Sequence, residues 1–198
     1  MPVVHSFDPP ERFVTGTVGE PGARTFFLQA RSGSRLVSVS LEKQQVAVLA
    51  ERIDELLDEV MRSANADTVV PAVAPYGLDD DAPLEQPITE EFRVGTMTLS
   101  WDPDDERVVL EIFPIDDDPS EELPTELMPT DALLDEETGP DEMLLVRLEP
   151  GHARAFVKRA GLVVEAGRPS CPFCGAPIDP EGHLCVRANG FKRRLSED

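Results

Sequence analysis

The chain has 198 residues, of which 40% are hydrophobic, and a formal net charge of −21 at pH 7. This length suits one sizeable domain with or without a small appended module, and the negative charge disfavours binding to nucleic acid or to an anionic membrane surface. The N-terminus lacks a basic region followed by an apolar core, and no apolar run is long enough to cross a bilayer. We therefore expect a soluble, cytoplasmic protein without membrane contact.

The first third of the chain predicts antiparallel strands followed by a helix. Apolar and polar residues alternate within 11–41, and Ser32-Gly33-Ser34 is typical of a hairpin turn between strands at 25–31 and 35–41. Apolar residues then recur at steps of three and four, which predicts an α-helix over about residues 42–62 with Glu42 in its first turn. Its apolar stripe consists of Val46, Leu49, Ile53, Leu56, Leu57 and Val60.

The middle of the chain predicts a loop and then a second hairpin. Residues 63–90 contain several prolines and an acidic run without either periodicity, so we expect a loop or linker. Strands at 92–101 and 107–113 follow, joined by a turn-forming Asp-Pro-Asp-Asp sequence. The apolar parity slips by one residue around Gly95, which predicts a β-bulge.

Residues 116–142 hold twelve acidic side chains and no basic one, so we expect a disordered insertion. A strand at 143–148 and a second helix opened by Pro150 complete the body. The predicted fold is α+β: residues 1–168 form antiparallel hairpins in one or two sheets with two covering helices. Residues 169–198 form a C-terminal zinc-knuckle hairpin with a basic tail.

All three cysteines of the chain lie within fifteen residues, together with one of its three histidines. Zinc binds thiolate and imidazole ligands tetrahedrally, and a Cys-x-x-Cys pair in a tight turn can grip one ion. The sequence therefore predicts one structural zinc ion held by Cys171, Cys174, His183 and Cys185. Four protein ligands leave no position for a reactive water, which disfavours a catalytic ion. Replacement of one ligand by Asp179, and an iron centre, remain alternatives.

The basic side chains near the cysteine cluster could have either of two roles. Three thiolates on Zn²⁺ leave a charge of −1, which Arg187 and Lys192 would neutralise. Arg187, Asn189 and Lys192 could instead contact a phosphorylated ligand, whereas the overall negative charge makes specific nucleic-acid binding the weaker hypothesis. His5 and His152 have no neighbouring partner in sequence, so we expect surface histidines.

Three segments resemble an actinobacterial family of unknown function, domain-of-unknown-function family 3090. They are the opening His-Ser-Phe-Asp-Pro-Pro-Glu-Arg-Phe at 5–13, Arg-Thr-Phe-Phe-Leu-Gln-Ala at 24–30, and the cysteine cluster through Gly190. The resemblance covers nearly the whole chain and implies no established activity. Members of the family are encoded beside a phosphomutase-like protein and a protein similar to lipid kinases, which implies a shared pathway.

Two functional hypotheses follow. The first is a zinc-stabilised interaction or adaptor protein, whose acidic insertion or metal-held tail docks a protein partner; it is favoured because no phosphate-binding loop, nucleophile elbow or dinucleotide fingerprint occurs. The alternative is an enzyme or binding protein for a phosphorylated small molecule in the shared pathway. We prefer the first, and with it a role other than catalysis.

Overall fold

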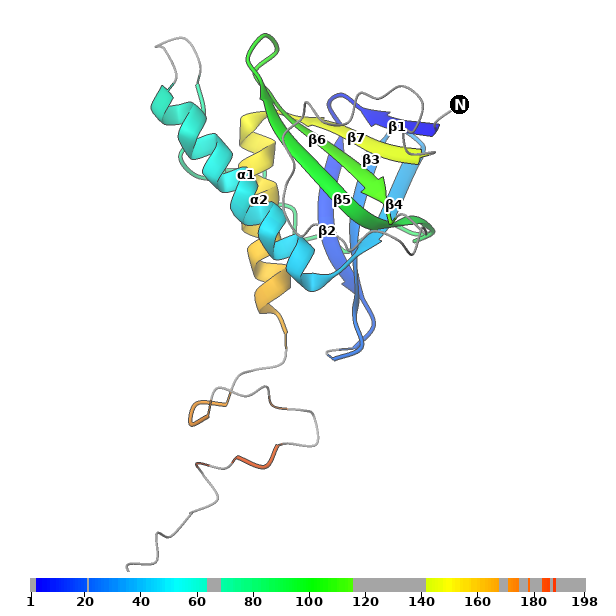
Figure 1. Ribbon diagram of the computed structural model, residues 1–198, viewed down its shortest axis with the longest axis vertical. Helices are drawn as coiled ribbons and strands as arrows, with labels where there is room; N and C mark the ends of the chain where they lie inside the picture. The colour runs from blue at the N-terminus through cyan, green and yellow to red at the C-terminus, as the bar shows by residue number, and fades with distance from the viewer. Residues whose placement is uncertain are drawn as a thin grey trace, which may run out of the picture.

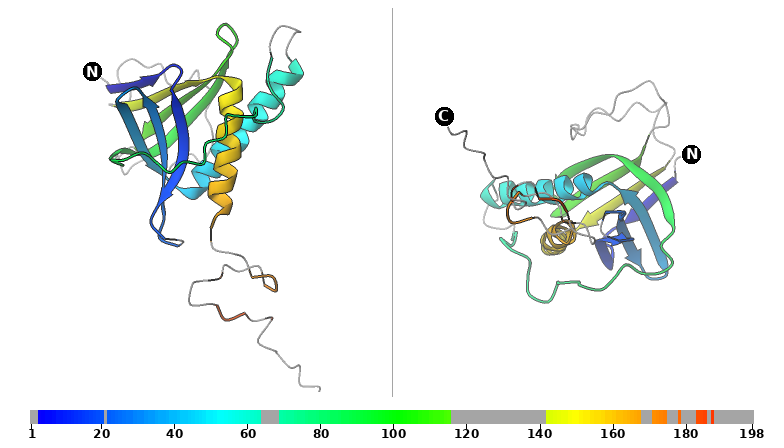
Figure 2. Two further views of the ribbon diagram at one scale, coloured as in Figure 1. Left: turned by 180° about the vertical axis from the view of Figure 1, so that it is seen from behind. Right: turned by 90° about the horizontal axis from the view of Figure 1, so that it is seen from below.

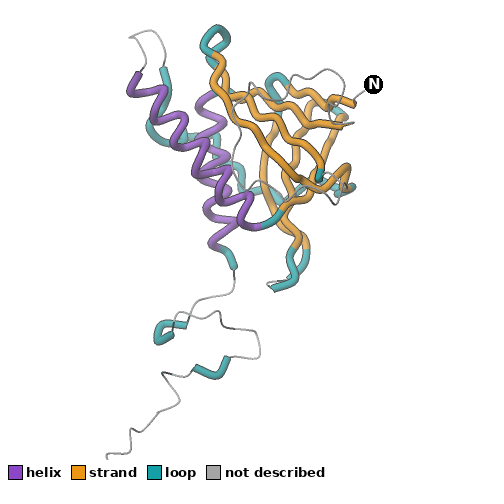
Figure 3. Tube along the Cα trace, viewed as in Figure 1, coloured by secondary structure: helices purple, strands orange, loops and turns teal. Residues whose placement is uncertain are grey.

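The computed structural model describes residues 3–20, 22–63, 69–115 and 142–167 of the body, and residues 171–174, 178, 183–185 and 187 of the C-terminal segment. Seven strands and two helices occur within these ranges (Figures 1 and 3). In chain order they are β1 (Val3–Phe7), β2 (Arg12–Val18), β3 (Thr25–Ser32), β4 (Arg35–Leu41), α1 (Lys43–Ser63), β5 (Glu90–Asp102), β6 (Arg107–Pro114), β7 (Glu142–Leu148) and α2 (Pro150–Glu165).

The described strands form a single mixed sheet in the order β1-β7-β6-β5-β4-β3-β2. Strands β2 to β4 and strands β5 to β7 are two antiparallel sets, each followed by a helix. The predicted α+β class is therefore confirmed. The two predicted hairpins are antiparallel, and the sheet also contains two parallel pairs that the sequence did not predict, β4 with β5 and β1 with β7. The strands of each parallel pair are far apart in sequence. Parallel pairing requires such a long connection, because a short hairpin can join only antiparallel strands.

Both helices lie side by side along the open side of a strongly curved sheet (Figure 2). The predicted inward-facing positions of the first hairpin are buried, with Leu28, Ala30 and Val39 all at 0% exposure. The predicted stripe of α1 is buried as well, apart from Leu56, which is partly buried against the same core. Alternating strands and a periodic helix thus bury one continuous apolar core, and its removal from water is the main force holding the fold.

Gly95 marks the predicted β-bulge and connects it to α1. The register between β5 and β6 shifts between Val94 and Met97, which confirms the bulge. A Cβ atom on Gly95 would lie 2.6 Å from the carbonyl oxygen of Pro114, so the backbones approach too closely for a side chain. The Gln45 amide donates to the carbonyl oxygens of Val94 and Gly95 at 3.1 and 3.2 Å.

The start of α1 differs slightly from the prediction. The helix begins at Lys43, so Glu42 precedes the first turn. The backbone N–H of Glu42 donates to Oε1 of Gln45 at 2.8 Å, which is half of a capping box. This side chain satisfies one of the donors that a helix N-terminus leaves without an intrahelical acceptor.

Residues 69–89, called the strap below, have no helix or strand, in agreement with the predicted loop. The strap nevertheless packs against the outer face of β2 and β3. Gln29, which is 1% exposed, accepts from the N–H of Glu85 at 2.7 Å and donates to its carbonyl oxygen at 3.1 Å. Leu84 packs against Val14 and Phe27 in a small second core. The face of the sheet away from the helices is therefore covered here.

Two predicted features fall outside the described residues. One is the acidic insertion, of which the structure describes only its last residue, Glu142, as the start of β7. The other is the boundary between residues 168 and 169 that separates the predicted body from the zinc-binding segment. Neither described helix has the length and apolar character needed to span a membrane.

Candidate metal centre

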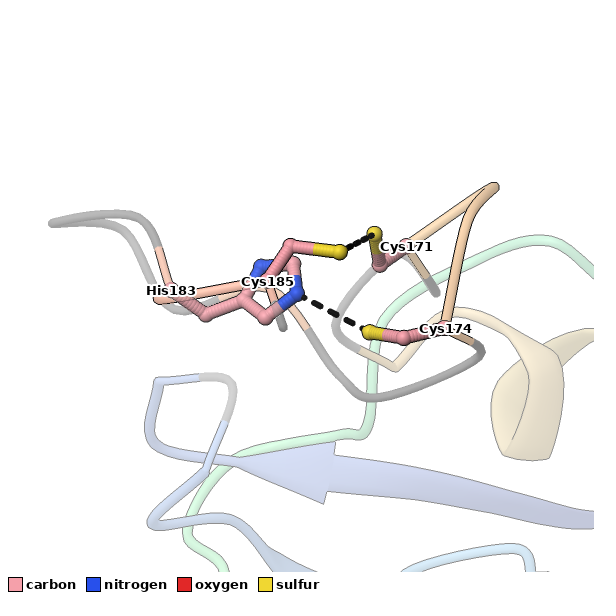
Figure 4. A group of neighbouring side chains, drawn as sticks. All are labelled: Cys171, Cys174, His183 and Cys185. Atoms are coloured by element: carbon pink, nitrogen blue, oxygen red, sulfur yellow. Dashed lines mark hydrogen bonds between the residues drawn. The ribbon is translucent and has the colours of Figure 1, made fainter. Parts of the chain in front are cut away.

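The structure brings together the four predicted zinc ligands (Figure 4). Cys171 and Cys174 lie at either end of a turn, and His183 and Cys185 come from a segment on the opposite side of the cluster. The three sulfur atoms and one imidazole nitrogen all lie within 4.8 Å of one another. Cys171 and Cys185 are 5% and 6% exposed, so half of the group is shielded from water.

The interatomic distances fit ligands that share one ion. Sγ of Cys171 and Sγ of Cys185 are 3.6 Å apart, and Sγ of Cys174 lies 3.2 Å from Nε2 of His183. Two thiolates at about 2.3 Å from a tetrahedral zinc ion lie about 3.7 Å apart. The sulfur pair is also far longer than a disulfide bond of about 2.05 Å. The group can hold a metal ion, and its donor set is one that zinc accepts.

The turn containing the first two ligands favours the thiolate form of Cys171. Burial raises the pKa of this thiol, but donation from the backbone N–H groups of Phe173 and Cys174 lowers it, and so do the Cys185 and Cys174 side chains. The net effect lowers the pKa of Cys171 from 9.0 to about 6. At neutral pH this ligand is therefore already in the form that binds a metal.

Arg187 contacts the turn that carries the first two ligands. Its Nη1 donates to the carbonyl oxygen of Phe173 at 3.1 Å, which connects the second half of the cluster to the Cys-x-x-Cys turn. Asn189, Lys192 and the alternative ligand Asp179 lie outside the described residues. The role predicted for Arg187 in neutralising the metal centre therefore stays a prediction, as do those of Asn189 and Lys192.

The two remaining histidines differ from each other. The side chain of His152 is 49% exposed, as predicted for a surface histidine. The side chain of His5 is only 13% exposed and lies 2.8 Å from Oε1 of Glu142, so the expectation of a surface histidine is wrong for this residue. The partner is 137 residues away along the chain, and only the pairing of β1 with β7 brings the two together.

A hollow with a volume of about 430 Å³ lies between the strap and α2. Arg12 and Arg159 line it, and both arginines hydrogen-bond to Asp80 of the strap. Arg159 also donates to the carbonyl oxygens of Thr15 and Ala82, at 2.7 and 2.8 Å. These guanidinium groups hold the strap against β2 and α2. No signal in the sequence indicates this contact, because it joins residues about seventy positions apart and more.

Fold and site together define an α+β protein with a C-terminal group of three cysteines and one histidine that can hold a metal ion. Over residues 5–185 the sequence matches the model of a family described as "Protein of unknown function (DUF3090)". The chain belongs to this family, as its resemblance in three segments predicted. No curated protein and no solved structure matches the chain.

Proposed function

We propose that the protein is a cytoplasmic interaction or adaptor protein, in which one structural zinc ion fixes a C-terminal docking surface for a protein partner. The observation that carries the proposal is the apolar surface beside the ligand cluster. Phe173 is 61% exposed and Leu184 is 86% exposed, and each is the immediate neighbour of a cysteine ligand. Metal binding would add to the folding free energy of this short segment, by an amount on the order of 10 kcal/mol in zinc-finger peptides.

The position of these two side chains explains why a metal would be needed. Phe173 lies between Cys171 and Cys174, and Leu184 lies between His183 and Cys185. A single ion that ties the four ligands together also fixes the two apolar side chains relative to each other. Large apolar side chains that stay in water next to a rigid element are typical of a protein-binding surface.

The charge of the chain supports a second contact. Residues 116–142 carry twelve acidic side chains, whereas residues 150–198 carry eight basic and five acidic ones. A partner with a basic surface would be attracted by the acidic segment at long range. We assign this segment to the encounter with the partner, and Phe173 and Leu184 to the specific contact.

Three observations weigh against the alternative, a protein that binds a phosphorylated small molecule. Both arginines in the hollow beneath the strap already donate to Asp80 and to strap carbonyl oxygens. Asp79, Asp80 and Asp81 line the same hollow, and carboxylates repel a phosphate group. Arg187, the other candidate for phosphate, donates to the carbonyl oxygen of Phe173.

The proposal is tested by capture of a partner from native lysate on the immobilised, zinc-loaded full chain. We expect one protein to be retained at stoichiometric amounts and to be lost with the double variant Phe173→Ser, Leu184→Ser. Cys174→Ser should lose it as well, because the docking surface then lacks its metal. Deletion of residues 116–141 should slow association without abolishing the complex.

Tyr76→Ser is the matched control. Tyr76 is fully exposed on the strap, so this substitution removes a similar apolar area at a distance from the cysteines in sequence. Retention of the same protein by Tyr76→Ser and by the wild type, with loss in the double variant, supports the proposal. Absence of any retained protein, or equal retention by the double variant, contradicts it.

A further inference from the structure

Three side chains from different strands meet at one end of the sheet. His5 lies on β1, Glu91 on β5 and Glu142 on β7, and one ligand atom of each lies within 4.8 Å of the other two. Nε2 of His5 is 2.8 Å from Oε1 of Glu142 and 3.9 Å from Oε1 of Glu91.

The topology explains how β5 and β7 both reach His5 although β6 lies between them. Strand β6 ends at Pro114, which pairs with Val94, so it does not extend as far as Glu91. The curvature of the sheet then brings β1 close to the start of β4, where Arg35 donates to the carbonyl oxygen of Ser6 at 3.0 Å. Glu91 and Glu142, which lie at the starts of β5 and β7, therefore reach His5 beyond the end of β6.

The charge of the group is unbalanced. Glu91 and Glu142 each place a carboxylate oxygen within 4.0 Å of Nε2 of His5, and no lysine or arginine of the described residues pairs with either carboxylate. Arg93, the basic residue nearest to Glu91 in sequence, pairs with Glu42 instead. Two carboxylates this close share one histidine, and like charges at such a distance repel each other unless a cation lies between them.

We propose that His5, Glu91 and Glu142 form a second metal site, which takes a divalent transition-metal ion through one imidazole nitrogen and two carboxylates. Imidazole disfavours calcium and magnesium, whereas mixed nitrogen and oxygen ligands suit manganese, iron and zinc. Ligand atoms that share an ion at about 2.1 Å lie roughly 3 to 3.5 Å apart. The Glu91 side chain is 39% exposed, so it has the freedom to close the longer distance.

This site differs from the cysteine group in its chemistry. It has three protein ligands and no sulfur, so it leaves coordination positions for water or for an exogenous ligand. The cysteine group offers four protein ligands and is closed. The two sites draw on separate residues, and the second does not depend on the docking function proposed above.

The test is a titration with Mn²⁺ of the full chain loaded with a single equivalent of zinc, followed by electron paramagnetic resonance of the free ion, in physiological salt with excess Mg²⁺ to suppress binding by exposed carboxylates. We expect one saturable Mn²⁺ site in the wild type. Glu91→Gln and His5→Gln should each weaken binding at this site more than tenfold. Mn²⁺ should also raise the midpoint of thermal unfolding of the wild type, with no such rise for Glu91→Gln.

His152→Gln is the matched control, because His152 lies 3.5 Å from Glu149 and pairs with no second carboxylate in the described part of the chain. This variant should bind Mn²⁺ as the wild type does. Glu91 is partly exposed, so Glu91→Gln should keep the far-ultraviolet circular dichroism of the wild type. The absence of a saturable site in the wild type overturns the proposal, and so do identical binding curves for the wild type and Glu91→Gln.

Discussion

Cys171 is the residue whose chemistry the structure defines most closely. Burial opposes ionisation of its thiol, yet the N–H groups of Phe173 and Cys174 stabilise the thiolate strongly enough to lower the pKa to about 6. The two main donors belong to its own turn, so we expect the effect to persist without a metal. A thiol of this kind binds metal at neutral pH without first having to lose a proton.

We predict that Cys171 of the metal-free, reduced protein ionises near pH 6. The lowered pKa means that this thiolate stabilises the folded turn fully above the ordinary pKa of 9.0, and that the stabilisation is lost as the pH falls through about 6. The measurement is thiolate absorbance at 240 nm between pH 5 and 10, taken as the difference between the wild type and Cys171→Ser. A midpoint close to 9 in this difference would show that the turn does not stabilise the thiolate.

At the scale of elements, the packing of the strap against the sheet and α2 is the feature that the sequence did not predict. Its prolines and acidic run indicate irregular backbone, and that much is confirmed. Its packing depends on side chains that look like ordinary surface charges in the sequence, such as Arg12 and Arg159, which are 11% and 12% exposed. Periodicity reveals buried apolar faces, but it carries no information on which distant carbonyl groups an arginine will satisfy.

We predict that Arg159→Met lowers the free energy of unfolding by about 1 to 3 kcal/mol. The substitution removes the guanidinium group that donates to the carbonyl oxygens of Thr15 and Ala82. Chemical denaturation measures this loss. Lys158→Met is the control: its pair with Asp79 is exposed on both sides, so its removal should cost under about 1 kcal/mol. Equal losses in the two variants would mean that the strap is not held by Arg159.

The contact of Arg12 with Asp80, which also holds the strap, has a defined pH dependence. Hydrogen bonding to Arg12 holds the pKa of Asp80 below its ordinary value of 3.8, although burial opposes this shift. A lowered carboxyl pKa contributes stability that is fully present above 3.8 and is lost as the pH falls through the lowered value. The strap should therefore remain anchored throughout the neutral and mildly acidic range.

At the scale of the whole molecule, the fold was predictable where the signal is local. The apolar alternation around Leu28, the stripe of α1 and the parity slip at Gly95 each predicted the observed structure. Strand β1 and the parallel pairs were not predicted, because they join segments that are distant in sequence. The cysteine group was predictable because its ligands are close together in sequence, whereas the group around His5 depends on the curvature of the sheet.

The central claim is that Cys171, Cys174, His183 and Cys185 hold one zinc ion. Metal analysis by mass spectrometry of the purified wild type, Cys174→Ser and His183→Ala tests it most directly, with His152→Gln as the control. We predict that the wild type and His152→Gln contain one more equivalent of zinc per chain than Cys174→Ser and His183→Ala. Equal zinc contents in all four proteins would contradict the claim.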